Sequence, residues 1–218
     1  MYEERILDYS DWMVYTLLLC IVLLTLLRIR LPYRFKSFLQ LAYQSNFIKH
    51  YNRDIDRRHL FTILTTMVHL LSNSLFLYIW LRYFTSKNSL QGFGGYIQTF
   101  TLYSIFVLGK MWIEQIIGIT IKRPLEISNY VYEKLVYKNL LSLYILVCNI
   151  LLLYTLPLTE ITLIIITLSI VFLNVLSLLS IYKRNSSHLF GHYFYFILYL
   201  CALEIAPYIL VVYAWIDF

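Results

Sequence analysis

The sequence is poor in the charged residues that keep a soluble protein in water. They make up 14% of its 218 positions, against about a quarter in an ordinary soluble domain. Apolar residues make up 60% and come in long blocks, with most of the charges between the blocks. A helix needs about 20 mostly apolar residues to cross a bilayer. The composition therefore excludes an ordinary soluble domain and predicts an integral membrane protein.

Signatures of catalysis and of ligand binding are also missing. The sequence contains no HExxH, GxSxG, GxxxxGK[ST] or CxxC pattern. Its three cysteines lie inside apolar blocks, where we interpret them as small buried hydrophobic residues: Cys20, Cys148 and Cys201. No nucleic-acid motif accompanies the basic charge. We therefore expect no enzyme, no cofactor, no metal site and no nucleic-acid binding.

The apolar blocks predict an all-α fold, a single membrane domain over residues 1–218 built as a bundle of six transmembrane helices. We expect the spans near residues 11–27, 60–81, 96–121, 135–155, 159–181 and 191–216. Helices are favoured over barrel strands because the blocks are long and do not alternate. The connection at 155–159 contains Pro157, so we expect a tight hairpin there, with Thr159 capping the helix that follows.

Basic residues are concentrated in alternate connections, which predicts an orientation. Fourteen of the 18 Lys and Arg residues follow the first, third or fifth span: Arg28, Arg30, Arg34, Lys36, Lys49, Arg53, Arg57, Arg58, Lys122, Arg123, Lys134, Lys138, Lys183 and Arg184. Because Lys and Arg favour the cytoplasmic side, both termini are predicted to be periplasmic. Aromatic residues at the outer ends of the spans, among them Trp12, Tyr15, Tyr78 and Tyr96, are interpreted as headgroup anchors.

The longest connection contains an amphipathic pattern over residues 33–48. Apolar residues recur there at helical spacing, while basic and amide side chains occupy the other face. We expect this helix to lie in the cytoplasmic interface against anionic lipid, and a docking helix for a protein partner is the alternative. The residues expected to make this lipid or partner contact are Arg34, Phe35, Lys36, Phe38, Leu39 and Tyr43.

Polar residues inside the predicted spans are the candidates for chemistry, because a lone charge at the bilayer centre costs at least about 2.5 kcal/mol. A bundle can bring several of them together as a buried polar cluster: Lys110, Glu114, Glu204, His69 and Asn73. Pro207 is predicted to kink the last span just beyond Glu204. Two interpretations are open: a network of ion pairs and hydrogen bonds that fixes helix packing, or a proton or ion relay.

The last apolar block also carries a family resemblance. Its run Tyr199-Leu200-Cys201-x-Leu203-Glu204-Ile205-x-Pro207 resembles the closing segment of an inner-membrane family of Bacteroidota catalogued only as a domain of unknown function (domain of unknown function 4271). Lys110 and the segment from Tyr132 to Tyr137 are similar to that family too. The resemblance implies a bacterial inner membrane and no particular reaction.

These features favour a non-enzymatic multi-pass protein of the bacterial inner membrane. We expect an accessory or scaffold subunit of a larger membrane assembly, one that serves envelope biogenesis or protein export. Its expected partners are the lipid bilayer, with anionic lipid on the cytoplasmic side, and other membrane proteins. A proton- or ion-coupled transporter that uses the buried Lys, Glu and His residues is the alternative, and a lipid-modifying enzyme is a third hypothesis.

Overall fold

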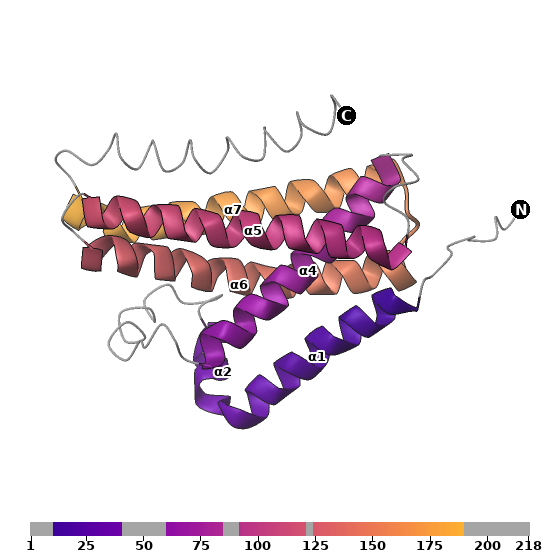
Figure 1. Cartoon of the computed structure of the whole chain (residues 1–218), viewed down its shortest axis with the longest axis horizontal. Helices are drawn as coiled ribbons and strands as arrows, with labels where there is room; N and C mark the ends of the chain where they lie inside the picture. Colours follow the sequence, from indigo (N-terminus) through magenta and orange to yellow (C-terminus); the bar gives the residue numbers. More distant parts are fainter. Residues whose placement is uncertain (1–10, 41–59, 85–91, 121–123, 190–218) are drawn as a thin grey trace, which may run out of the picture. The chain divides into compact units, whose positions relative to one another are not determined.

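The computed structural model describes residues 11–40, 60–84, 92–120 and 124–189, and the regular structure in these ranges is all helical. Six helices follow one another there (Figure 1): α1 Trp12–Arg30, α2 Pro32–Gln40, α4 Leu60–Phe84, α5 Gly92–Thr120, α6 Pro124–Tyr154 and α7 Glu160–Leu189. The chain divides into two compact units, Met1–Ser177 and Leu178–Phe218. The first unit contains α1 to α6 and most of α7.

Four of these helices are long and apolar enough to cross a membrane. They are α1, α4, the Tyr130–Tyr154 part of α6 and the Glu160–Ile181 part of α7. At those positions the structure has helices of the length and apolar composition that the sequence predicts. The third predicted span is occupied by α5, a helix of 29 residues that contains Lys110 and Glu114 and is not among these four. The sixth predicted span, 191–216, lies outside the described residues, so the count of six stays a prediction.

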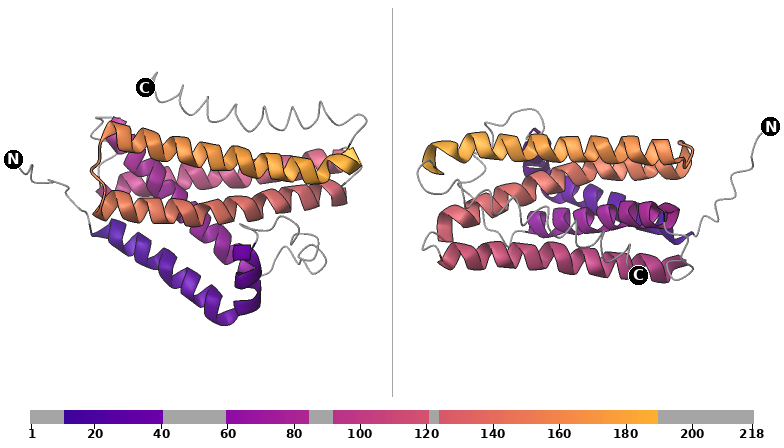
Figure 2. Two further views of the ribbon diagram at one scale, coloured as in Figure 1. Left: turned by 180° about the vertical axis from the view of Figure 1, so that it is seen from behind. Right: turned by 90° about the horizontal axis from the view of Figure 1, so that it is seen from above.

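Helices α6 and α7 form the predicted hairpin. Pro157 lies in the short connection between them. The backbone amide of Thr162 donates a hydrogen bond to Thr159 Oγ1 at 3.3 Å, which confirms Thr159 as the cap of α7. Figure 2 shows the two helices side by side, and the hydroxyls of Tyr144 and Ser169 meet across them at 2.9 Å. This hydrogen bond is a contact between α6 and the part of α7 that belongs to the first unit.

Helix α4 is the central element of the first unit. It packs against α1, α5 and α6, and 56% of its candidate span is buried, against 28% for α1. The core around it includes Leu75 of α4, Leu17 and Cys20 of α1, and Leu152 of α6. Because α4 is enclosed in this way, polar side chains on it have to find partners inside the protein.

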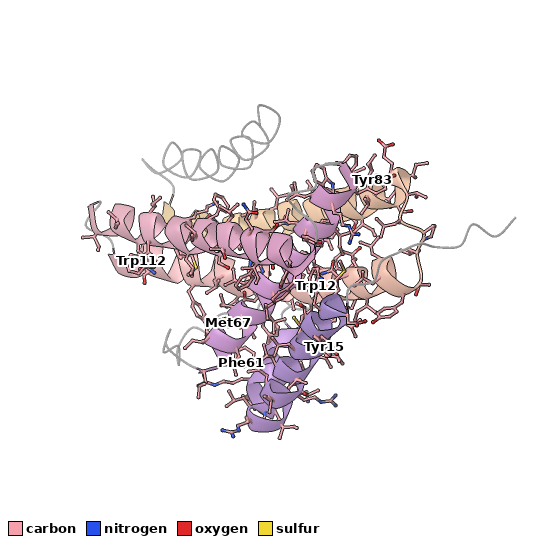
Figure 3. All side chains as sticks on the ribbon, turned by 45° about the vertical axis from the view of Figure 1, so that its right-hand side comes forward. Trp12, Tyr15, Phe61, Met67, Tyr83 and Trp112 are labelled. Atoms are coloured by element: carbon pink, nitrogen blue, oxygen red, sulfur yellow. The ribbon has the colours of Figure 1, made fainter. Side chains whose placement is uncertain are left out.

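The outer faces of the bundle stay apolar and exposed. Ile29 of α1, Trp112 of α5 and Ile161 of α7 are 77%, 72% and 71% exposed. Figure 3 labels Trp112 toward the end of α5. Rows of exposed apolar side chains on long helices suit a hydrocarbon environment, which supports a membrane protein.

Helix α2 packs back on the first turn of α4. Phe38 is 1% exposed, and its ring meets the ring of Phe61 at 5.5 Å between centroids in an edge-on arrangement. The predicted lipid contact is thus wrong for Phe38, because its side chain is buried against Phe61 inside the protein. The other described residues of that set keep partial or full exposure: Arg34, Phe35, Lys36 and Leu39. Tyr43 lies outside the described residues, and the interfacial position of the helix stays a prediction.

Aromatic residues from three helices pack together near the start of α1. Trp12 stacks on Tyr96 at 5.0 Å between centroids and meets Tyr78 edge-on at 5.2 Å. Tyr78 is 1% exposed and Tyr96 is 5% exposed, whereas Tyr15 is 67% exposed. The anchor interpretation is therefore wrong for Tyr78 and Tyr96. Their hydroxyls find partners in the protein, since Tyr78 donates to the carbonyl of Gly92 and Tyr96 accepts from Ser74.

Candidate functional site

A buried ion pair joins α5 to α6. Lys134 Nζ lies 2.7 Å from Glu114 Oε1, and neither side chain is more than 5% exposed. The ring of Tyr130 lies 5.9 Å from the same ammonium group. Each charge offsets the desolvation of the other, while either one alone would be strongly unfavourable here. The pair therefore fixes α5 against α6 at this point.

The sequence analysis did not identify Lys134 as a buried partner of Glu114, because α6 begins before the apolar run from which the span was predicted. The helix starts at Pro124, a residue that suits the first position of a helix, and continues through Lys134. Lys134 consequently lies inside α6. Its charge had led us to predict a position in the cytoplasmic connection that precedes this helix. The available signal was the pair of valines around it, Val131 and Val136, both of which are buried.

Further charged groups lie near this ion pair in the sequence. Lys110 lies one turn before Glu114 on α5, and its ammonium nitrogen is buried. Glu133 is 5% exposed. Lys134 is one turn from the end of the candidate span that begins at Tyr130, a depth at which a charge costs less than at the bilayer centre.

Polar side chains line the contact between α4 and α6, and we call this set the polar ladder. Its hydrogen bonds join Thr62 to Tyr132 at 3.4 Å, Asn139 Nδ2 to the hydroxyls of Thr65 and Thr66 at 3.1 and 3.2 Å, Ser72 Oγ to the carbonyl of Ser142 at 3.4 Å, and Asn149 Nδ2 to the carbonyl of Ser72 at 2.8 Å. Partner numbers rise together along both helices, so α4 and α6 run parallel. Ser72 and Ser142 are fully buried, and such small residues let two membrane helices approach closely.

His69 connects the polar ladder to α5. Asn73 Nδ2 lies 3.1 Å from His69 Nδ1, and the hydroxyl of Tyr103 lies 3.3 Å from His69 Nε2. The amide nitrogen of Asn73 only donates, so Nδ1 accepts and Nε2 carries the ring proton. His69 and Asn73 are thus hydrogen-bonded to each other, and Tyr103 is a partner that the sequence does not indicate.

The predicted polar cluster is divided between two levels of α5. His69 meets α5 at Tyr103, whereas Lys134 meets it at Glu114. These two α5 positions are 11 residues apart, which is about 16.5 Å of helix rise. Glu204 and Pro207 lie outside the described residues, so the predicted meeting of Glu204 with Lys110 and the kink at Pro207 stay predictions.

Two carboxamide oxygens of the polar ladder have no hydrogen-bond partner among the described residues. They are Asn139 Oδ1 and Asn149 Oδ1, on side chains that are 2% and 0% exposed. Buried acceptors of this kind are commonly satisfied by internal water. Within the described ranges no three His, Cys, Asp or Glu side chains are grouped as a metal site requires. The arrangement thus supplies helix pairing and a line of hydrogen-bonding groups.

Comparison with known proteins identifies the chain at the level of its family. A family profile described as a domain of unknown function (DUF4271) matches residues 13–215. The chain belongs to this family. No curated protein and no solved structure matches it. Because the description of the DUF4271 family names no activity, the function of this member has to be argued from the ion pair and the polar ladder.

Proposed function

We propose that this DUF4271 protein is a non-enzymatic, six-span protein of the bacterial inner membrane that acts as an accessory or scaffold subunit of a larger membrane assembly. The process it serves is envelope biogenesis or protein export. The Glu114–Lys134 contact supports this most directly. A carboxylate engaged at 2.7 Å by a lysine of the next helix contributes to helix packing.

The directions of the helices support six spans. Contacts between α4 and α5 pair Tyr78 with Gly92, Ser74 with Tyr96, and His69 with Tyr103. Partner numbers rise on α5 as they fall on α4, so α5 returns antiparallel through the same depth. The parallel course of α4 and α6 fits one crossing between them. With a last span at 191–216 and the basic connections in the cytoplasm, both termini are periplasmic.

The exposed faces of the bundle are the surfaces available to partners. Many of the buried polar groups of the described residues lie on the inner contacts of α4, and much of the exposed surface of α1, α5 and α7 consists of apolar side chains. Lipid, including anionic lipid on the cytoplasmic side, and the apolar helices of other membrane proteins are the partners that such faces take.

Crosslinking in native membranes tests the assembly role. After solubilisation in mild detergent, the chain is expected to purify with at least one other membrane protein at a fixed ratio, measured by mass spectrometry. The physical reason is that an accessory subunit buries an apolar face on its partner, and this contact survives mild detergent. A monodisperse monomer with no crosslinked partner contradicts the proposal.

Single-cysteine labelling provides the matched test of orientation. In a background without native cysteines, Arg30→Cys is expected to react only with a membrane-permeant reagent, and Thr155→Cys also with an impermeant one. The two exposed positions lie at the C-terminal ends of α1 and α6, which the six-span scheme places on opposite sides. Equal reactivity of both positions with the impermeant reagent contradicts the scheme.

The polar ladder favours one second candidate, proton- or ion-coupled transport. Hydrogen-bonding groups follow α4 from Thr62 to Tyr78, which is about 24 Å of rise in a hydrocarbon layer of about 30 Å. Asn139 Oδ1 and Asn149 Oδ1 offer places for water along it. Proton flux into proteoliposomes that falls in a His69→Gln variant would support transport. A flux no greater than that of empty vesicles removes this candidate.

A further inference from the structure

The corner where α1 meets α2 carries four basic side chains, which we call the cationic corner: Arg28, Arg30, Arg34 and Lys36. Three of them are exposed, and Arg34 is half-exposed. From Trp12 to Arg53 the sequence contains no Asp or Glu. No ion pair joins any of the four to another described residue. The corner therefore presents concentrated positive charge that the described part of the protein leaves uncompensated.

The cationic corner is held on ordered helical turns. Only Leu31 separates the end of α1 at Arg30 from the start of α2 at Pro32. Phe38 then fixes α2 against Phe61 of α4. Figure 3 shows nitrogen-tipped side chains projecting outward where α1 and α2 meet. Because the backbone that carries them is already ordered, gathering these charges on one ligand loses less entropy than it would in a loop.

An exposed apolar stripe on α1 leads to the cationic corner. Its members are spaced alternately four and three positions apart, which places them on one face of the helix: Tyr15, Leu19, Val22, Leu26 and Ile29. Each of them is at least 45% exposed. The stripe extends over 14 positions, or about 21 Å, which exceeds the depth of about 15 Å of one leaflet. It is long enough to accompany an acyl chain through its leaflet.

We propose that the cationic corner and this stripe form a binding site for one anionic phospholipid. The phosphate is held by the four basic side chains, and an acyl chain lies along α1. Guanidinium groups bind phosphate oxygens through paired, charge-assisted hydrogen bonds. Tyr33, which is 81% exposed in the first turn of α2, supplies an amphipathic ring at headgroup level. The site rests on the proposed membrane location, but not on the assembly role.

Lipid retention by the purified full-length protein tests the site. Native mass spectrometry from detergent compares phosphatidylglycerol with phosphatidylcholine of the same acyl chains, and preferential retention of phosphatidylglycerol is expected. One basic residue near an anionic surface strengthens binding about five-fold. Arg28→Gln/Arg30→Gln should therefore weaken phosphatidylglycerol binding about 25-fold and leave phosphatidylcholine unchanged. The matched control is Arg82→Gln in the last turn of α4, which should change neither.

Two outcomes overturn the site: equal retention of both lipids by the wild-type protein, or an undiminished preference in the double variant. A second variant, Arg34→Gln/Lys36→Gln, must lose the preference too, so the result does not depend on the folding of one variant. Because the measurement uses the isolated chain in detergent, it is independent of any protein partner. Failure of the lipid site and failure of the assembly role are therefore distinguishable.

Discussion

Replacement of Glu114 by leucine is expected to destabilise the protein by about 3–5 kcal/mol. The change leaves the ammonium group of Lys134 buried without the carboxylate that lies 2.7 Å from it. The free energy of unfolding, measured from the dependence of α-helical structure on the fraction of denaturing detergent in mixed micelles, is the quantity to compare.

A double variant separates the ion pair from the simple loss of a side chain. Glu114→Leu/Lys134→Met removes both charges, so its free energy of unfolding should lie closer to that of the wild type than that of Glu114→Leu does. Glu160→Leu is the matched control, because this acidic residue is exposed in the first turn of α7. It should lose about 0.3–1 kcal/mol at most. Additive losses from the two changes at Glu114 and Lys134 would show that these side chains are not coupled.

Truncation of Tyr78 to alanine is the second change expected to have a large effect, a loss of about 3–5 kcal/mol. Its ring is 1% exposed and packs on Trp12 and Tyr96, so its removal leaves a cavity between three helices. The same mixed-micelle unfolding measurement applies. Tyr78→Phe keeps the ring and removes only the hydroxyl that donates to the carbonyl of Gly92, so it should lose about 0.6 kcal/mol.

Tyr15 provides the control for this prediction. It lies in the same end of the bundle and is 67% exposed. Tyr15→Ala should therefore change the free energy of unfolding by no more than about 0.5 kcal/mol. If Tyr15→Ala were as destabilising as Tyr78→Ala, the separation of these two aromatic residues into an outer and a buried group would be refuted.

The helix positions were predictable because the thickness of a bilayer sets the length of a spanning helix. A contiguous apolar run of that length can be read directly from the sequence. The apolar blocks at 11–27, 60–81 and 159–181 correspond to α1, α4 and the apolar part of α7. The cap at Thr159 was predictable for a similar reason, since a cap depends on residues only three positions apart. The start of α6 was harder to place, because Glu133 and Lys134 interrupt the apolar pattern inside a continuous helix.

The partners of the polar side chains were less predictable. Glu114 has Lys110 one turn away on its own helix, yet the contact that the structure defines is with Lys134 of α6. Tyr103 is one of many tyrosines in this chain, and nothing in its local sequence points to His69. Such contacts depend on how each helix is rotated about its axis and on which helix lies beside it. Spacing along one helix does not contain that information.

The sequence by itself determined that this chain has long helices apolar enough to cross a membrane, and that two of them are joined by a short connection around Pro157. These properties depend on composition and on neighbours in the chain. Only the tertiary structure decided that α4 lies at the centre, that α6 runs parallel to it along the polar ladder, and that Lys134 is the buried partner of Glu114. The physical reason is that any sufficiently long apolar run is stable as a helix in a lipid-like environment, so it can be recognised from the sequence alone. The partners of polar side chains depend instead on which faces of different helices meet.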